Sequence, residues 1–544
     1  MLVRSMFRGS LSSLMRGYLV LACASAALAV GACGGDADAN QAEGDASPAP
    51  RRDAATGTDA GGSDAKVAAL SLAPLSPARI VRATSFDVPV VLAAPASGSD
   101  VVITVVGLPP EVTAAPLTMA AGSTKANLKL SATASAKLAS RTSVTVRATA
   151  GGSVAETSLS VVIVDPPGTL DTTFDADGKV FADFAGNGSD IGMTMVRQAN
   201  GSVIVGINDI PNNRVYLARY GENGEPDPTF GTAYVGEGGI TSPAGLKQRA
   251  DGSLVLTYRT GTVGNPTGAK VVAFDANGKP NTQFGSLGEL KLDASLLGAN
   301  PSRTMLATAP NGDIYGLAVY TGNNHIFRLT QDGKLDPTFG DNGKVSLGNY
   351  FEAYGWNIDA KGGFILAGST GFPAYDRIAV RLLPDGQYDT SFSGDGRLTL
   401  SGASSESFDS PLVLSNGRVA LGGTITEYGQ VSAFLPNGDA DTAFGAAGIA
   451  STKGTTPMRL GVYGEEIIAV GSSSMFYEEM RITRISTTTG APNAKFGENG
   501  VLSITSAAKN VGNTFVIDDI GRITILGARS DASDFDTTLM RIWL

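Results

Sequence analysis

A single phrase recurs seven times between Gly168 and the C-terminus: glycine, two residues, Asp or Asn, two residues, then Phe. Successive phenylalanines are 52 to 56 residues apart, and they are Phe174, Phe230, Phe284, Phe339, Phe392, Phe444 and Phe496. Six copies place another glycine four residues after the Phe, and in the second copy we expect Gly239 to take that place. So regular a period predicts a repeat architecture with one supersecondary unit per copy.

Each unit has the pattern of four short strands. In the first copy the apolar runs cover residues 179–184, 193–197, 202–207 and 214–220. They are rich in Val, Ile, Tyr and Phe and are separated by Gly, Asn and Asp, which is typical of strands joined by turns. Asn200-Gly201 and its counterparts in later copies supply the positive φ of a tight hairpin. Four antiparallel strands per ~50 residues predict an all-β fold, a seven-bladed β-propeller over 168–544. A coil of a β-helix needs only ~20 to 30 residues, so this period is too long for a β-helix.

The two ends of the repeat array predict how the ring closes. The first phrase is followed by an orphan strand at 179–184, and the last copy ends with 539–544 and no strand after it. If the orphan strand completes the last sheet, no sheet edge is left open.

The phrase itself is interpreted as structural. Each Phe is expected to pack between adjacent blades, and the Asp or Asn three residues earlier is expected to cap a turn with its side chain. A calcium loop is the alternative, because Asp175-Ala176-Asp177-Gly178 carries closely spaced carboxylates. No copy has the alternating ligand set with a closing Glu, so no metal or other cofactor is predicted.

Three segments resemble a known family: 171–180, 336–345 and Ala-Arg-Tyr at 218–220 are similar to the delta-60 repeats of bacterial surface proteins. The resemblance covers 168–544 and implies propeller blades. Later copies depart from the pattern, since Lys495 replaces a small residue before Phe496 and Thr489-Gly490 replaces Asn-Gly. The family brings no catalytic residues to carry over.

Residues 1–33 have the pattern of an export signal. Arg4, Arg8 and Arg16 precede an apolar stretch at 17–30, which is shorter than the ~20 residues of a membrane-spanning helix. Residues 30–33 resemble a bacterial lipobox, which implies cleavage before Cys33, lipid attachment to its sulfur and, with Gly34 next, an outer-membrane location on the cell-surface or periplasmic side. An ordinary secretory signal is the alternative.

Two further segments precede the repeats. Residues 34–66 consist mainly of Gly, Ala, Asp, Ser and Pro, which predicts a disordered acidic linker. Residues 67–165 contain seven candidate strands, at 68–72, 85–92, 101–106, 114–117, 126–132, 143–148 and 156–164. Seven short strands in ~100 residues predict an Ig-like β-sandwich, and 107–113 resembles bacterial Ig-like modules.

Charge and composition exclude several functions. Loss of the signal, with three arginines and no acidic residue, changes the formal charge from −10 to −13, which argues against nucleic acid as a partner. The chain has one histidine, His325, so a multi-histidine zinc site is impossible and a Ser-His-Asp triad depends on that residue. We interpret His325 as a loop or turn residue at a strand entry, without a catalytic role. The sequence therefore predicts no catalytic residues.

One aromatic cluster remains as a candidate ligand site: Tyr350, Phe351, Tyr354 and Trp356 in the fourth copy. These residues are either packing between blades or a ligand-contact patch on one propeller face. We expect a monomeric envelope lipoprotein that recognises a protein or glycan. An alternative is a polysaccharide hydrolase or lyase using carboxylates at the propeller channel, and a third possibility is a purely structural envelope component.

Overall fold

The computed structural model describes most of the chain from residue 70 onward. The described residues are 70–94, 98–139, 141–184, 186, 188–230, 233–234, 243–262, 265–298, 300–320, 323–348, 351–370, 375–401, 406–425, 428–452, 455–473, 479–505, 509–530 and 534–544. The predicted signal and linker, Cys33, Gly239 and Tyr350 lie outside them. Within the described residues the chain divides into two compact units, 70–165 and 166–544.

The first unit contains two β-sheets. One has the strand order β1-β8-β7-β3-β5 and the other β2-β6-β4. The strands are β1 (Ala78–Val81), β2 (Ser85–Val91), β3 (Val101–Val106), β4 (Val112–Ala114), β5 (Leu117–Met119), β6 (Lys125–Ala132), β7 (Arg141–Ala150) and β8 (Ser153–Val164). Buried and exposed residues alternate along β6, so one face of its sheet contributes Leu128 and Leu130 to the core.

Two strand predictions for this unit were wrong. The predicted strand at 114–117 covers the last residue of β4, the two-residue connection and the first residue of β5, and residues 70–72 form only an isolated bridge, Leu72 to Leu92. The sequence analysis also missed β1, which pairs in parallel with β8. Four residues with two buried side chains, Ala78 and Ile80, are too short to show an alternating pattern.

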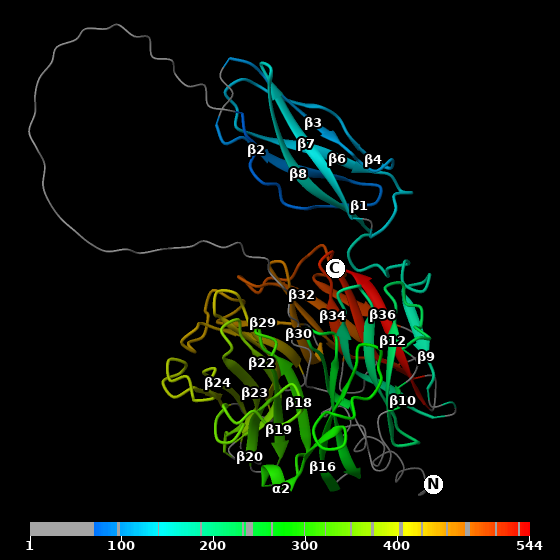
Figure 1. Ribbon diagram of the computed structural model, residues 1–544. Helices are drawn as coiled ribbons and strands as arrows, with labels where there is room; N and C mark the ends of the chain where they lie inside the picture. The colour runs from blue at the N-terminus through cyan, green and yellow to red at the C-terminus, as the bar shows by residue number, and fades with distance from the viewer. Residues whose placement is uncertain are drawn as a thin grey trace, which may run out of the picture. The chain divides into compact units, whose positions relative to one another are not determined.

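The second unit contains seven four-stranded sheets within its described residues, and Figure 1 shows them following one another along the chain. The first three are β10 (Asp190–Arg197), β11 (Val203–Asp209), β12 (Arg214–Tyr220) and β13 (Ala233–Tyr234); β14 (Pro243–Gln248), β15 (Leu254–Thr262), β16 (Asn265–Phe274) and β17 (Glu289–Leu292); and β18 (Arg303–Thr308), β19 (Ile314–Tyr320), β20 (Asn323–Leu329) and β21 (Lys344–Ser346).

The remaining sheets have the same order. They are β22 (Glu352–Ile358), β23 (Phe364–Thr370), β24 (Asp376–Leu382) and β25 (Arg397–Leu400); β26 (Ser407–Val413), β27 (Val419–Ile425), β28 (Tyr428–Phe434) and β29 (Ile449–Ser451); β30 (Thr456–Tyr463), β31 (Glu466–Ser472), β32 (Met480–Ser486) and β33 (Val501–Ile504); and β34 (Lys509–Ile517), β35 (Arg522–Ser530), β36 (Phe535–Trp543) and β9 (Lys179–Ala182).

The seventh sheet joins the two ends of this unit. Its outer strand β9 pairs antiparallel with β36, from Lys179 opposite Met540 to Ala182 opposite Thr537, and the two strands lie side by side in Figure 1. The first strand of each sheet contacts the first strand of the next, and β34 contacts β10. The seven sheets therefore form a closed ring whose first strands lie innermost, and the predicted pairing of the orphan strand is confirmed.

The Asn-Gly and Asp-Gly pairs lie in hairpins as predicted, but the turns are longer than expected. In the first sheet Arg197 pairs with Val203, so five residues connect β10 and β11. Gly201 has φ +90°, whereas Asn200 accepts a hydrogen bond from the Ser202 amide through its side chain. Only the glycine needs the left-handed region, because the Asn side chain holds the turn in place.

The described residues contain one short α-helix, α2 (Ala294–Leu297), which the sequence did not predict. Asp293 caps it by accepting from the Ser295 and Leu296 amides, and Gly298 ends it in the left-handed region. Its buried Leu297 belongs to the core between the second and third sheets. A four-residue helix gives too short a pattern for a periodicity argument.

The core of the ring is divided among the junctions between sheets. Each junction holds one cluster of buried hydrophobic residues drawn from two neighbouring sheets. Each cluster contains one phenylalanine of the repeated phrase, from Phe174 between the seventh and first sheets to Phe496 between the sixth and seventh. The expectation that each Phe packs between adjacent sheets is confirmed.

Candidate functional site

The repeated phrase builds a structural latch at every junction of the ring. We use latch for three groups: the repeat Phe, the Asp or Asn three residues earlier, and a guanidinium that contacts either of them. The Asp or Asn accepts a hydrogen bond from the amide two residues later in all seven copies, for example Asp171 from Thr173 at 3.1 Å. The predicted turn cap is therefore confirmed.

The guanidinium of the latch was not predicted. In five copies it comes from the third strand of the sheet, where an arginine lies over the Phe ring. The distances from guanidinium carbon to ring centre are 4.6 Å for Arg541 and Phe174, 4.9 Å for Arg219 and Phe230, 5.5 Å for Arg328 and Phe339, 6.0 Å for Arg381 and Phe392, and 5.0 Å for Arg484 and Phe496. Four of these arginines also pair with the Asp, at 2.7 to 3.2 Å.

The latch also reaches the next sheet. Arg219 Nη1 donates to the Ala276 carbonyl oxygen at 3.0 Å, and Arg381 Nη1 donates to the Pro436 carbonyl oxygen at 2.9 Å. The first glycine of the phrase lies against the preceding Phe: a Cβ on Gly333, whose φ is +77°, would meet the Phe284 ring at 2.6 Å. Glycine is required there by both the backbone conformation and the close approach.

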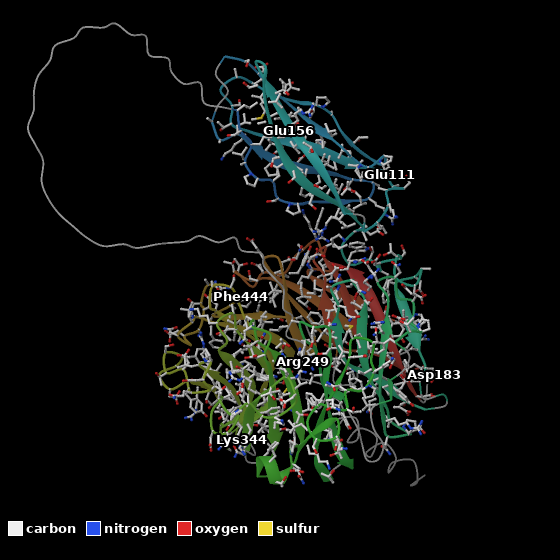
Figure 2. All side chains as sticks on the ribbon, viewed as in Figure 1. Glu111, Glu156, Asp183, Arg249, Lys344 and Phe444 are labelled. Atoms are coloured by element: carbon white, nitrogen blue, oxygen red, sulfur yellow. The ribbon has the colours of Figure 1, made fainter. Side chains whose placement is uncertain are left out.

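Where the chain departs from the phrase, a neighbouring side chain supplies the missing group. Ala433 stands where other copies have the third-strand arginine, and Arg418 pairs with Asp441 instead, at 2.7 Å. Arg249 likewise lies 5.6 Å from the Phe284 ring centre; Figure 2 labels Arg249 and Phe444. In the last copy Glu466 pairs with Arg484 and accepts from Asn493 at 2.7 Å, so it replaces the absent carboxylate. The latch is thus a stabilising device.

The first strands of the sheets differ from the latch because their side chains vary. Six of the seven carry a β-bulge, an extra residue that interrupts pairing with the second strand. The bulged residues are Met193, Ala244, Tyr354, Asp409, Pro457 with Met458, and Asn513. Bulges often re-aim a side chain next to functional sites. A ligand site is therefore expected among these inner strands.

Five polar residues on four consecutive first strands form what we call the bulge cluster: Arg303, Glu352, Tyr354, Asp409 and Arg459. Arg303 is 4% exposed and lies with its guanidinium carbon 5.2 Å from the Tyr354 ring centre. Its Nη1 donates to the Ala353 carbonyl oxygen at 2.7 Å, and its Nη2 lies 3.5 Å from Glu352 Oε1. Glu352 is half exposed, so the cluster has an open side.

Asp409 is the buried acid of this cluster. Burial raises the pKa of the Asp409 carboxyl, while a hydrogen bond from Ser407 at 2.7 Å and the charges of Arg459 and Arg303 oppose that rise. Burial and the charge of Glu352 raise the pKa of Tyr354 to about 12. The Tyr354 hydroxyl bonds the Ser369 hydroxyl at 2.9 Å. The cluster thus places two arginine cations near a buried carboxyl group whose ionised form is disfavoured.

The other side of the inner ring is neutral at its bulges. Met193, Ala244 and Asn513 carry no charge, and Asn513 donates to the Gly192 carbonyl oxygen at 2.8 Å, which links the seventh sheet to the first. Among the bulged residues only Asp409 is charged; the buried Asp190 and Lys247 of the first two sheets lie at other points along their first strands.

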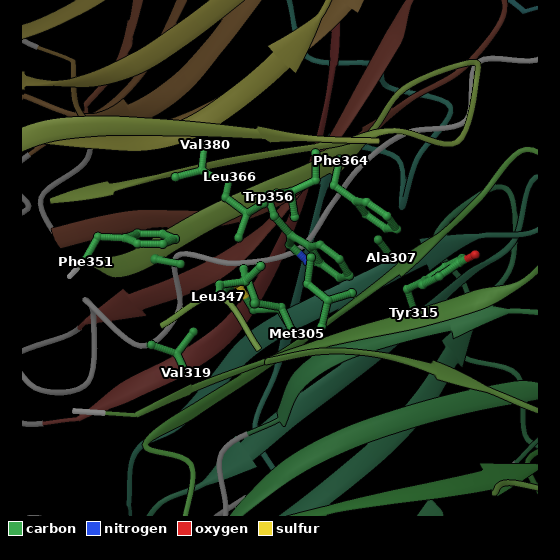
Figure 3. Close-up of a cluster of buried hydrophobic side chains, with 14 of the residues drawn as sticks. Met305, Ala307, Tyr315, Val319, Leu347, Phe351, Trp356, Phe364, Leu366 and Val380 are labelled. Carbon is green, nitrogen blue, oxygen red and sulfur yellow. The ribbon is translucent and has the colours of Figure 1, made fainter. Parts of the chain in front are cut away.

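The structure places the predicted aromatic residues in two environments. Phe351 and Trp356 are 7% and 5% exposed and belong to the core between the third and fourth sheets. Figure 3 shows Trp356 near Met305, Leu347 and Phe364, and its ring stacks on Phe364 with centres 6.1 Å apart. Packing therefore accounts for these two side chains. Tyr354, whose ring is partly exposed, is the predicted residue that joins the bulge cluster.

His325 was wrongly interpreted as a loop or turn residue. It lies within β20, paired with Ala318 and Ser346, and it is buried. Burial and the positive charge of Lys344 lower its pKa, so the neutral form is favoured. Asn323 and Asn324 precede it and resemble a turn, which misled the sequence argument.

Among the described residues, three carboxylates approach closely enough to consider a metal ion: Asp183, Asp190 and Asp536, with oxygens within 4.8 Å of one another. The Asp190 oxygens already accept from the Phe184 and Thr537 amides, at 2.8 and 2.9 Å. The group lies outside the repeated phrase. Among the residues that the structure describes, no helix is long and apolar enough to cross a membrane.

Comparisons with known proteins identify the class of the ring. A family model described as "Domain of unknown function (DUF5122) beta-propeller" matches residues 198–230 and 310–339. Both matched segments end at a repeat phenylalanine, Phe230 and Phe339. No curated protein matches the chain. The ring of sheets is a β-propeller.

Solved structures give remote likenesses. A protein of unknown function from Dyadobacter fermentans is 10% identical with a TM-score of 0.35, covering 68% of this chain and 99% of that one. A quinoprotein alcohol dehydrogenase-like protein from Bacteroides thetaiotaomicron is 10% identical with a TM-score of 0.28, covering 68% and 93%. Drosophila Plexin A, solved with Semaphorin 1b, is 12% identical with a TM-score of 0.36, covering 69% and 88%. Scores this low carry no argument about function.

Sequence reasoning missed most of the bulge cluster. Arg303, Asp409 and Arg459 occupy comparable strands in different copies, but each copy has a different residue there, so the repeat gives no signal. Every first strand carries at least one charged residue, from Asp190 in the first sheet to Lys509 in the seventh, but at differing positions along the strand. That irregularity was the available signal.

Proposed function

We propose that this protein is a cell-envelope lipoprotein that uses a seven-bladed propeller of delta-60-like repeats to recognise a protein or glycan. In this proposal residues 1–33 are the lipoprotein signal, Cys33 carries the lipid, and 34–66 form the tether. Residues 67–165 form an Ig-like spacer. The location is the outer membrane, on its surface or periplasmic side, and the protein is a monomer.

One observation carries the recognition role. The latch repeats its chemistry around the ring, whereas a charged residue at the bulge position itself, Asp409, occurs in the fifth sheet alone, with Arg303 and Tyr354 close to it. A ring that served structure alone would need no buried charge at that position, because burying ionisable groups is costly. The asymmetry therefore supports a binding site over a purely structural component.

Capture experiments with the full-length chain, purified in detergent, test recognition. The chain serves as bait for envelope extracts and, in parallel, for a glycan array. We expect a retained partner, and we expect Tyr354→Ala to lose it. Phe181→Ala is the matched control, because Phe181 is also partly exposed with an arginine over its ring, Arg529 at 5.0 Å, but lies on outer strand β9. Equal loss in both variants contradicts the proposed site.

A polysaccharide hydrolase or lyase remains the second candidate, favoured by the pair of carboxylates beside Tyr354. Glu352 is half exposed, whereas burial raises the pKa of Asp409, and such unequal environments separate an acid from a base. We expect any such enzyme to release oligosaccharides and to lose that activity in Asp409→Asn. Binding without product release, across a panel of envelope polysaccharides, contradicts this candidate.

The anchor is tested separately. We expect the full chain to incorporate labelled palmitate and to fractionate with outer membranes, and we expect Cys33→Ala to lose the label. Labelling that persists in Cys33→Ala contradicts the lipid attachment.

A further inference from the structure

The bulge cluster has a charge balance that depends on one exposed side chain. Arg303 Nη2 lies 3.5 Å from Glu352 Oε1, an ion-pair distance longer than that of a tight hydrogen-bonded pair. The Arg303 Nε atom is buried and makes no hydrogen bond. Glu352 is half exposed, so water competes for its carboxylate and it is free to rotate away. Arg303 thus holds its exposed partner loosely.

Movement of Glu352 leaves the cluster positive. Arg303 and Arg459 bring two guanidinium cations, whereas burial disfavours the charged form of Asp409. This contrasts with the whole chain, whose formal charge is −10. An anion that replaces the Glu352 carboxylate therefore meets the Arg303 guanidinium, which lies 5.2 Å from the Tyr354 ring centre.

We propose that the bulge cluster binds the carboxylate of a sugar acid, a uronate, which takes the place of the Glu352 carboxylate on Arg303. This inference rests on the proposed recognition function and names its ligand class. The planar guanidinium matches a carboxylate, and the hydroxyl of the partly exposed Tyr354, which can donate and accept, matches a sugar hydroxyl.

The surroundings favour a sugar acid over an acidic protein. Protein interfaces depend on several exposed aromatic and arginine anchors at their centre, whereas here Arg303 is buried and Tyr354 is only partly exposed. Among the described side chains, the exposed large hydrophobic residues all lie off the seven first strands. The aromatic residues next to the cluster, Phe351 and Trp356, are buried in the core. A small polar ligand needs no such anchor.

Titration calorimetry of the full-length chain with glucuronate tests the inference, with glucose and an acidic peptide as comparison ligands. We expect glucuronate to bind and glucose to bind at least tenfold more weakly, since loss of a charged partner costs about that much. Glu352→Gln removes the competing carboxylate, so we expect affinity for glucuronate to rise about threefold. Glu498→Gln removes the same charge at an exposed turn position and is expected to change nothing.

Arg303→Lys keeps the charge but removes the planar fork, and we expect about a tenfold loss of glucuronate affinity. Weaker or unchanged binding in Glu352→Gln overturns the inference, as does preference for glucose or for the acidic peptide. If envelope glycans are captured but glucuronate does not compete, the recognition function stands and the uronate assignment falls. If the chain captures nothing and glucuronate does not bind, both fall.

Discussion

The latch and the first-strand bulges occupy equivalent places in successive sheets, yet the chain repeats one and varies the other. The repeat position is Phe in all seven copies, and each ring is buried at a junction. The bulge position holds Met193, Ala244, Tyr354, Asp409 and Asn513 in different sheets. A position that closes a junction needs the same shape every time, whereas a bulge needs only a backbone irregularity.

Departures from the repeat sharpen this contrast. In the last copy the latch lacks its carboxylate, and Glu466 replaces it beside Asn493. At the bulges, by contrast, the residue changes from sheet to sheet, and the charged one is Asp409 in the fifth sheet. The replacement of a missing latch group indicates that the latch is needed for stability. The bulged residues show no such replacement, so they are free to differ between sheets for binding.

The largest expected effect comes from opening the ring. Deletion of 538–544 removes most of β36, which pairs with both β35 and β9. We expect the propeller to lose its cooperative thermal transition, because the first and seventh sheets are then no longer joined. Differential scanning calorimetry measures this, with deletion of 34–66 as the control. A truncated chain that melts as cooperatively as the control contradicts closure by β36.

Removal of one latch ring comes next. Phe444 is fully buried between the fifth and sixth sheets, so Phe444→Ala is expected to lower the free energy of unfolding by about 3–5 kcal/mol. Tyr354→Phe is the matched change at a bulge and removes only the hydroxyl that bonds Ser369, at a cost of about 1 kcal/mol. Urea denaturation compares the two. Similar losses in both variants would break the contrast between latch and bulge.

The replacement in the last copy is testable by exchanging the two groups. Asn493→Asp places a second carboxylate against Glu466, at a position where the Asn nitrogen is 2.7 Å from Glu466 Oε1. We expect a loss of about 1–2 kcal/mol from the repulsion and the lost hydrogen bond. Adding Glu466→Gln restores one carboxylate for Arg484 and is expected to recover most of that stability. A double variant no better than Asn493→Asp argues against compensation.

The smallest effect concerns the pH dependence caused by Asp409. Its pKa is raised above the ordinary value of 3.8, so the folded state binds this proton more tightly than the unfolded state does. Its contribution to stability is therefore greatest at low pH and is lost as pH rises through the folded pKa, by at most about 1.4 kcal/mol per pH unit. The groups that interact with it are Arg459, Arg303, Tyr354 and Ser407.

Urea denaturation from pH 4 to pH 7 isolates that effect as the difference between the unmodified chain and Asp409→Asn. We expect the unmodified chain to lose stability relative to the variant as pH rises. A difference that stays constant, or that runs in the opposite direction, contradicts a raised pKa at this position.

Much of the propeller was predictable because the sequence patterns that specify its strands and turns are local and repeated. The spacing of Phe174 and its six counterparts gave the number of units, and Asn-Gly pairs gave the hairpins. Short elements without a repeat were not predictable: β1 and α2 are four residues each, and His325 follows two asparagines that imitate a turn. Tyr354 was singled out with three aromatic neighbours, but sequence could not separate it from Phe351 and Trp356, which are buried.

By itself, the sequence determined the repeating unit, its strands and the junction at which each phenylalanine is buried, because turn chemistry and apolar spacing act over a few residues. Only the tertiary structure decided which side chains meet across sheets. Arg303 and Asp409 are 106 positions apart and lie on the third and fifth sheets, with the fourth sheet between them, so no local pattern relates them. Ring closure brings their strands to the centre, where burial and charge give each residue its role.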